Sequence, residues 1–360
     1  MKTALVLSGG GSTGAYQAGV IRALDELEMK FDIVTGTSIG SINGAMYITG
    51  NIAKTYDMWK TLTFKNIFEE DIKYESQKDE LDVIKKYIKI ASRGGAEPSN
   101  LKKMLIDIID LDKFYNSPID YGLVTVNFPS LKPLKLTKKD IKRDKLFDYM
   151  IASSTVFPVF KLKNIDNKKY VDGGVRDTMP YDLAIKMGAE KIIIVNISYF
   201  FKYAKIPKKI RNKYDITIIR PRNKTGPSLM FEGKQATKNM QYGYNDAMKV
   251  FGKLYGNKYT FKSLPDDIKM LEYLGRVFKI DDSKIYSIND YNKKIYKLLD
   301  KIKLKRVSNI KDMKSILNSQ ERIKFIYNKL LEEDTKSINI IKKILNKEYL
   351  AAYYIYDMYK

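Results

Sequence analysis

One short stretch limits what this chain can fold into more than any other. A β-branched run ends at Val34-Thr35 and is followed by Gly36-Thr37-Ser38-Ile39-Gly40, after which small residues continue as a predicted helix. This order predicts a serine on a tight turn between strand and helix, with glycines on both sides to avoid collisions. The first amides of the helix would favour negative charge at Ser38. The pattern also fits an ordinary Gly/Ser loop, but Ser38 is a candidate nucleophile, supported by Gly36 and Gly40.

The composition restricts the chemistry that is open to Ser38. The 360 residues include no cysteine and no histidine. A Ser-His-Asp triad and a zinc site with thiolate or imidazole ligands are therefore excluded. A serine nucleophile in this chain needs a carboxylate or a lysine as its base, and we expect neither a metal nor another cofactor.

A glycine-rich loop follows the first predicted strand, Thr3 to Leu7, and opens a predicted helix. Gly9, Gly11 and Gly14 satisfy Gly-x-Gly-x-x-Gly, which is also the pattern of a dinucleotide-binding loop. That interpretation requires an acidic residue at the end of the next strand to hold the ribose. Here the next strand leads into the serine turn instead.

The same loop suits an oxyanion hole. Successive glycines leave the amides of Gly10 and Gly11 uncovered by side chains, so that they can reach a developing alkoxide. The amide of Ile39, directly after the candidate nucleophile, is the natural additional donor.

A candidate base follows a later predicted strand, Lys169 to Val171. Asp172-Gly173-Gly174 is by itself typical of a simple turn. An ordinary aspartate has a pKa of about 3.9 and is a weak base, so burial would have to raise the pKa. Together with the serine turn and the glycine loop, Asp172 is the expected base, and Gly173 and Gly174 would let the serine turn approach closely.

Strands alternate with helices over the first two hundred residues. Gly122 to Asn127 and Lys191 to Ile197 have the apolar character of buried strands, and Leu146 to Ser153 is a predicted helix. This alternation predicts an α/β fold with a mainly parallel central sheet. We expect a hydrolase domain over residues 1–225 and a helical, lysine-rich region over residues 226–360.

An apolar cluster between the second and third predicted strands has two interpretations. Trp59, Leu62, Phe64, Ile67 and Phe68 lie close together in the sequence. They would form either a lid that contacts lipid or helices that pack into the core.

Three sequence blocks together resemble a known family. Residues 7–14 (Leu-Ser-Gly-Gly-Gly-Ser-Thr-Gly), 36–40 and 172–174 look like the signature blocks of patatin-like phospholipases, bacterial relatives of the plant lipid acyl hydrolase patatin. The resemblance covers about residues 3 to 200. It implies a three-layer α/β sandwich, Ser38 as nucleophile, Asp172 as base and the loop from Gly9 to Gly14 as oxyanion hole. Family members often carry Arg or Lys where this chain has Thr13.

The net charge is +23, which is typical either of a protein with anionic partners or of a solvated, lysine-rich surface. The N-terminal apolar run is too short for a signal peptide, and no run reaches the about 18 apolar residues of a membrane span. We expect a cytoplasmic protein that contacts membrane surfaces peripherally. We do not expect nucleic acid as its partner, and the oligomeric state stays open.

These observations predict a serine acyl hydrolase that cleaves the fatty-acyl esters of phospholipids or other lipids. Two alternatives stay open: a general esterase or thioesterase with the same Ser-Asp dyad, and a basic protein that binds lipid surfaces without catalysis.

Overall fold

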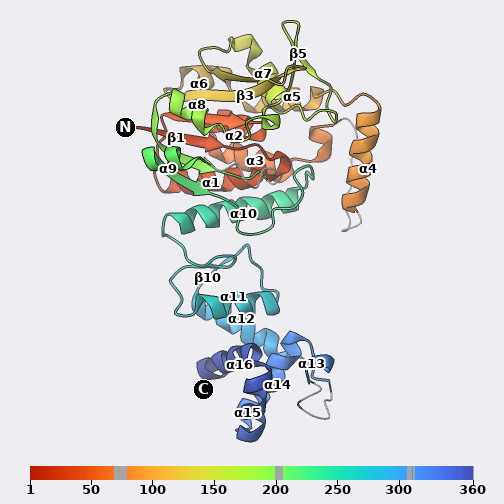
Figure 1. The fold of residues 1–360 in the computed structure, drawn as a ribbon, viewed down its shortest axis with the longest axis vertical. Coiled ribbons are helices and arrows are strands. Elements are labelled where there is room, and N and C mark those ends of the chain that lie inside the picture. The colour runs from red at the N-terminus through yellow and green to blue at the C-terminus, as the bar shows by residue number, and fades with distance from the viewer. Residues whose placement is uncertain (69–78, 199–205, 306–309, 311–312, 360) are drawn as a thin grey trace. The chain divides into compact units, whose positions relative to one another are not determined.

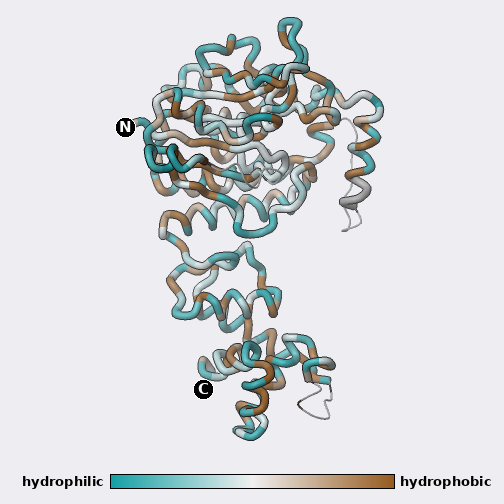
Figure 2. The backbone as a smooth tube through the Cα atoms, in the orientation of Figure 1, coloured by the Kyte–Doolittle hydropathy of each residue, from teal (hydrophilic) through white to brown (hydrophobic). Residues whose placement is uncertain are grey.

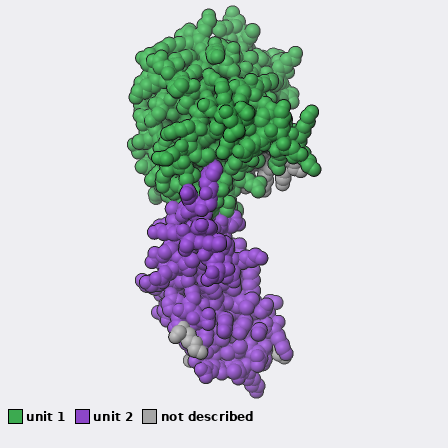
Figure 3. All heavy atoms as spheres, turned by 90° about the vertical axis from the view of Figure 1, so that its left-hand side faces the viewer, with its two compact units in different colours: residues 1–250 green, residues 251–360 purple. Residues whose placement is uncertain are grey.

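The chain forms two compact units. The structure, a computed structural model, describes residues 1–68, 79–198, 206–305, 310 and 313–359. The units are Met1–Val250 and Phe251–Lys360, coloured separately in Figure 3.

The first unit is built on an eight-stranded sheet with the order β5-β6-β3-β2-β1-β7-β8, in which β4 also pairs with β3 (Figure 1). The strands are β1 (Lys2–Leu7), β2 (Ile33–Thr37), β3 (Asp120–Phe128), β4 (Pro133–Thr137), β5 (Lys163–Ile165), β6 (Lys168–Asp172), β7 (Ala189–Val195) and β8 (Asp215–Ile219). β1, β2, β3, β7 and β8 run parallel, whereas β4 and β6 are antiparallel to β3. The predicted α/β class with a mainly parallel sheet is confirmed.

Helices cover both faces of this sheet. The helices of this unit are α1 (Gly14–Glu26), α2 (Ile39–Ile48), α3 (Ile52–Thr61), α4 (Asp79–Ser92), α5 (Ser99–Ile108), α6 (Leu111–Asn116), α7 (Leu146–Ser153), α8 (Tyr181–Lys186), α9 (Lys208–Lys213) and α10 (Gly233–Val250). Side chains alternate between the faces along a strand. Ala4 and Val6 therefore pack with Ala184 of α8 on one face, while Val34 lies under Gly44 of α2 on the other. Three layers result.

Helix α10 belongs to the first unit because it packs tightly on α1. A Cβ at Gly19 would collide with the carbonyl oxygen of Met240, and a Cβ at Gly243 would collide with that of Tyr16. The two glycines thus allow the helix backbones to touch. The predicted boundary fell between residues 225 and 226, before α10, whereas the units divide after Val250.

The apolar cluster from Trp59 to Phe68 packs into the core: Trp59, Leu62, Phe64, Ile67 and Phe68 are all buried. Helix α4, in contrast, alternates between short hydrophobic (brown) and hydrophilic (teal) stretches in Figure 2, and its Ile84 and Ile88 are exposed.

Among the described residues, no helix combines the length and the apolar content needed to cross a membrane.

The second unit is mainly helical and has its own apolar core. It contains β9 (Thr260–Phe261), β10 (Ile285–Tyr286), α11 (Ile268–Val277), α12 (Ile288–Asp300), α13 (Met313–Ile316), α14 (Ser319–Leu331), α15 (Thr335–Ile344) and α16 (Asn346–Tyr359). Tyr291 is fully buried, and its ring packs edge-on against Tyr259, Phe261 and Tyr286. The helical C-terminal region is confirmed, with a short parallel strand pair that the sequence did not predict.

Candidate active site

Ser38 occupies a strained turn between β2 and α2. Its φ is 54° and its ψ is −128°, a backbone conformation that residues other than glycine rarely adopt. A Cβ at Gly36 would collide with the carbonyl oxygen of Gly40, and a Cβ at Gly40 would collide with that of Leu7. The predicted glycines are therefore required by backbone contacts, and the turn presents the serine hydroxyl at the end of the sheet.

Strand register brings Ser38 to Asp172. Strand β4 occupies one edge of β3, so β2 and β6 share the other edge end to end. Thr37 is the last partner of β2, opposite Val124, and Asp172 pairs with the next residue, Thr125. The hydroxyl of Ser38 consequently donates to Oδ2 of Asp172 at 2.7 Å, although 134 positions separate the two in the chain.

The surroundings of Asp172 hold its carboxyl group and change its basicity. Its Oδ1 accepts a hydrogen bond of 2.7 Å from the amide of Gly174. Asp172 is 7% exposed. Burial raises its pKa to about 6, against the lowering effect of the hydrogen bonds from Ser38 and Gly174. A Cβ at Gly173 would collide with the carbonyl oxygen of Val124, so glycine is needed for β6 to turn here.

A second serine, which sequence reasoning missed, supports the turn. The backbone amide of Ser38 donates to Oγ of Ser153 at 2.8 Å. The Ser153 hydroxyl in turn donates to the carbonyl of Val124 at 2.7 Å. Ser153 is the last residue of α7 and is fully buried. It fixes the serine turn to the strand on which Asp172 is also paired.

The glycine loop lies beside Ser38, and its amides differ in availability. The amide of Gly9 donates to the carbonyl of Thr178 at 3.0 Å. For the amides of Gly10, Gly11 and Ile39, no acceptor lies within reach in the part of the chain that the structure describes. These three predicted donors can therefore bind an oxyanion, whereas Gly9 fixes the loop.

Thr13 and Gly14 shape the rest of the loop. The hydroxyl of Thr13 donates to the carbonyl of Gly10 at 2.6 Å, so the residue that departs from the family pattern braces the loop from within. A Cβ at Gly14 would meet Ile39 at 2.5 Å and Trp59 at 2.7 Å. This glycine lets α1 start directly beside the serine turn.

A buried chain of amide side chains connects the loop to the helices behind it. Gln17 donates to the carbonyl of Ser8 at 2.7 Å, Asn43 donates to Gln17 at 2.9 Å, and the indole of Trp59 donates to Asn43 at 3.1 Å. No sequence motif marked these residues, because each lies on a different helix.

A cleft of about 250 Å³ opens above Ser38 and Asp172 and is bordered by Gly9, Gly10 and Gly11. At its rim, the apolar side chains of Phe157 and Val175 are 51% and 47% exposed. Among the described residues, no three acidic side chains are grouped to hold a metal ion. The arrangement combines a hydroxyl, a buried carboxyl group and free amide donors in an apolar cleft.

Comparison with known proteins agrees with this arrangement. The family model described as "Patatin-like phospholipase" matches residues 5–185, just over half of the chain. The chain belongs to the patatin-like phospholipase family. The matched range contains the glycine loop, the serine turn and Asp172, and the sequence resemblance is confirmed. Residues 186–360 lie outside the family model.

Several curated proteins match part of this family member. "Lysophospholipase nte1" of Aspergillus terreus is 58% identical over 43 residues, which are 12% of this chain and 3% of that protein. "Patatin-like phospholipase domain-containing protein 6" of Homo sapiens is 27% identical over 205 residues, 54% of this chain and 13% of that protein. The chain thus spans a small fraction of the length of these relatives.

Among solved structures, VipD from Legionella pneumophila aligns with a TM-score of 0.43 and 15% identity, covering 98% of this chain and 90% of VipD. The type III effector ExoU aligns with a TM-score of 0.36 and 12% identity, covering 98% of this chain and 76% of ExoU.

Proposed function

We propose that the protein is a lipid acyl hydrolase of the phospholipase A type, in which Ser38 and Asp172 form the catalytic dyad. The observation that carries the proposal is the 2.7 Å hydrogen bond from the Ser38 hydroxyl to a buried carboxylate whose pKa is raised to about 6. A base with this pKa is still ionised at neutral pH and is stronger than an ordinary aspartate. We assign this chemistry to the first unit and none of it to the helical C-terminal region.

We assign each step of the proposed reaction to a residue. Asp172 takes the hydroxyl proton while Oγ of Ser38 attacks the ester carbonyl carbon. The amides of Gly10, Gly11 and Ile39 stabilise the oxyanion that forms, and a single well-placed donor of this kind is worth about 2.7–4 kcal/mol. Asp172 then returns the proton to the leaving alcohol as the ester bond breaks. Water, activated by the same carboxylate, releases the acid from the acyl-serine.

Lipid is the substrate class that the cleft and the family support. Phospholipases cleave lipid esters, and Phe157 and Val175 expose apolar surface at the rim of the cleft. The net charge of +23 favours anionic lipid headgroups. We therefore propose that the enzyme works from the cytoplasm on a membrane surface that it contacts peripherally.

The experiment compares wild type and Asp172→Asn on vesicles of mixed anionic and zwitterionic phospholipids and on a soluble short-chain ester. Wild type should release fatty acid from the vesicles, and the Asn variant should lose turnover on both substrates while keeping its fold by circular dichroism. Near-normal hydrolysis by the variant would remove Asp172 from the mechanism. Cleavage of the soluble ester alone would favour the general esterase.

A further inference from the structure

The serine borders a second pocket in addition to the open cleft. This apolar pocket has a volume of about 60 Å³, and Ser38, Gly11 and Leu229 line both it and the cleft. Asp172 lines the cleft and is absent from the walls of the smaller pocket. The two sides of Ser38 therefore differ in their access to the base.

This difference determines which half of an ester lies on each side of Ser38. Asp172 must return a proton to the leaving oxygen, which has to lie within hydrogen-bond reach of its carboxyl group. The alcohol half consequently lies in the open cleft. Resting on the proposed function, we propose that the smaller pocket receives the acyl chain of the scissile ester, and that Leu229 and Phe231 determine how long a chain it accepts.

The walls of the smaller pocket suit a hydrocarbon chain. Ile42 of α2 is 1% exposed, and on another wall the rings of Phe68 and Phe160 stack at 4.9 Å between centroids and 8° between planes. Phe231 is 8% exposed and adds a third ring to the walls. A methylene group placed in such surroundings gains about 0.8 kcal/mol.

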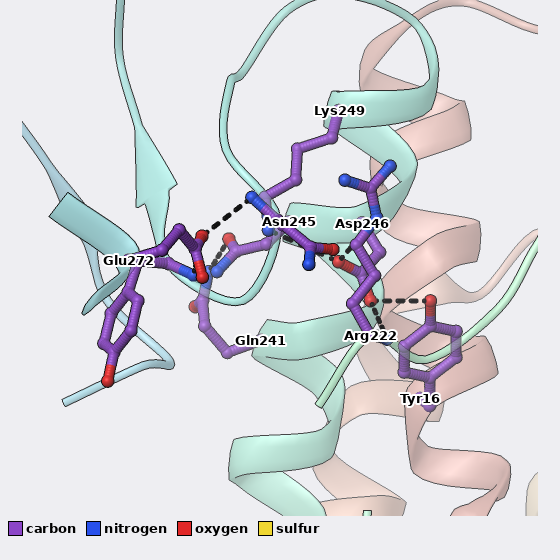
Figure 4. Close-up of polar contacts among 9 residues, drawn as sticks. Tyr16, Arg222, Gln241, Asn245, Asp246, Lys249 and Glu272 are labelled. Carbon is purple, nitrogen blue, oxygen red and sulfur yellow. Dashed lines mark hydrogen bonds and ion pairs between the residues drawn. The ribbon is translucent and has the colours of Figure 1, made fainter. Parts of the chain in front are cut away.

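Leu229 and Phe231 belong to a segment outside the family model, residues 222–231, which we call the strap. Its start is fixed to α10, where the amide of Arg222 donates to Oδ2 of Asp246 at 3.1 Å. Figure 4 shows that Tyr16 of α1 reaches the same carboxylate, to which its hydroxyl donates at 3.0 Å. The strap is thus tied to the helix that follows the glycine loop.

The middle of the strap is held against the glycine loop itself. The amide of Ser12 donates to the carbonyl of Ser228 at 2.7 Å. The hydroxyl of Ser12 donates to the carbonyl of Pro227 at 3.0 Å. The hydroxyl of Tyr87 donates to the carbonyl of Leu229 at 2.5 Å. Hydrogen bonds from Ser12 and Tyr87 to the strap carbonyls therefore fix the position of Leu229 in the pocket wall, two residues before Phe231.

The size of the pocket sets the expected chain length. An apolar cavity of about 150 Å³ accommodates benzene, with its six carbons. The pocket beside Ser38 has less than half of that volume, so it holds only the first few carbons of an acyl chain. A longer chain requires Phe231 or its neighbours to be displaced.

The test uses p-nitrophenyl alkylphosphonates with alkyl chains from ethyl to dodecyl. Oγ of Ser38 forms a bond to phosphorus, the bond from phosphorus to the nitrophenyl oxygen breaks, nitrophenolate leaves, and Asp172 takes the hydroxyl proton. The alkyl chain thus stays on the enzyme in the position of the acyl chain. The rate is followed by nitrophenolate absorbance, and the site by mass spectrometry of the Ser38 peptide.

For wild type, the rate should rise about fourfold with each added methylene, since a gain of 0.8 kcal/mol corresponds to that factor. It should stop rising at about propyl, because the pocket has less than half of the volume that accommodates six carbons. Phe231→Ala should extend the rise, so that its ratio of hexyl to propyl rates exceeds the wild-type ratio by about tenfold or more. Phe231→Leu, a milder change in case the alanine variant does not fold, should move the limit in the same direction. The matched control is Phe157→Ala, because Phe157 lines the cleft and not the smaller pocket, and it should keep the wild-type length limit.

A rate that keeps rising to dodecyl in wild type would overturn the chain-length inference, and so would equal length profiles for the Phe231 variants and Phe157→Ala. In both cases modification of Ser38 would leave the proposed function standing. If none of the probes modifies Ser38, the proposed function is overturned, and the acyl pocket with it.

Discussion

Asp172→Asn should stabilise the first unit while it removes activity. Burial raises the pKa of Asp172 from 3.8 to about 6, and each pKa unit corresponds to about 1.36 kcal/mol. Between pH 3.8 and about 6 the unfolded chain loses this proton and the folded chain keeps it, so stability falls as the pH rises. The loss reaches about 3 kcal/mol above pH 6. Asparagine never ionises, so the variant avoids this loss.

Thermal unfolding is the appropriate assay, followed by the fluorescence of Trp59. Trp59 is the only tryptophan of the chain and is buried in the first unit, so its signal reports on that unit. A difference of about 3 kcal/mol corresponds to a rise in Tm of about 6–12 °C for a domain of this size. The rise should be present at pH 8 and nearly absent at pH 4. An Asn variant that is no more stable than wild type at pH 8, or that gains equally at both pH values, would refute the reasoning.

Asp148→Asn is the matched control, since it makes the same change at a carboxylate with the opposite shift. Burial tends to raise the pKa of Asp148, but the hydrogen bonds and charges of Lys102 and Lys163 outweigh it and the pKa is lowered. Both lysines lie 2.8 Å from its Oδ1. The interactions of ionised Asp148 with Lys102 and Lys163 therefore stabilise the fold above the pKa of the unfolded chain, and this stabilisation is lost as the pH falls. Asp148→Asn should consequently lower Tm at pH 8, and lower it less at low pH.

Three further predictions follow from the site. The value of kcat/KM should fall about tenfold per pH unit below about pH 6, because the base must be ionised, and a profile that is flat down to pH 4.5 would exclude Asp172 as this base. Ser153→Ala should cost about 1–3 kcal/mol in urea unfolding and lower kcat, because the amide of Ser38 loses its acceptor; Ser153→Thr, which keeps the hydroxyl, should recover part of both. Gly40→Ala should prevent folding of the first unit, because its Cβ would collide with the carbonyl of Leu7, and a soluble variant with native Trp fluorescence would contradict this.

Much of the site could be predicted because its parts are local in the sequence. The turn at Ser38 requires glycines at fixed offsets, and Gly173 is needed where β6 ends. Such backbone requirements leave a readable pattern. The order of strands and helices likewise follows from apolar runs, as β7 and α7 illustrate.

The rest could not be predicted because it depends on contacts between distant segments. Ser153 is one of many serines, and only the register of β2 and β3 places its hydroxyl under Ser38. The amide of Gly9 looks as open as those of its neighbours until the segment after Asp172 brings the carbonyl of Thr178 to it. Strand β4 starts with proline and is half-exposed, so its sequence lacks the apolar run of a buried strand.

The smaller apolar pocket beside Ser38 could not be predicted from the sequence for the same reason. Its walls come from distant parts of the chain: the glycine loop, the serine turn and α2, the segment around Phe68, α5, residues 154–160 and the strap. No single motif connects these places. The apolar residues from Trp59 to Phe68 allowed two interpretations, and tertiary packing alone decided between them.

The most direct test of the central claim is fatty-acid release from mixed anionic and zwitterionic phospholipid vesicles by wild type and Ser38→Ala, measured side by side. If Ser38 is the nucleophile, wild type releases fatty acid and the alanine variant loses at least about a thousandfold in rate, as expected when a catalytic nucleophile is removed. An alanine variant that stays within about tenfold of wild type would contradict the account, because the acyl group would then have to be transferred without Ser38.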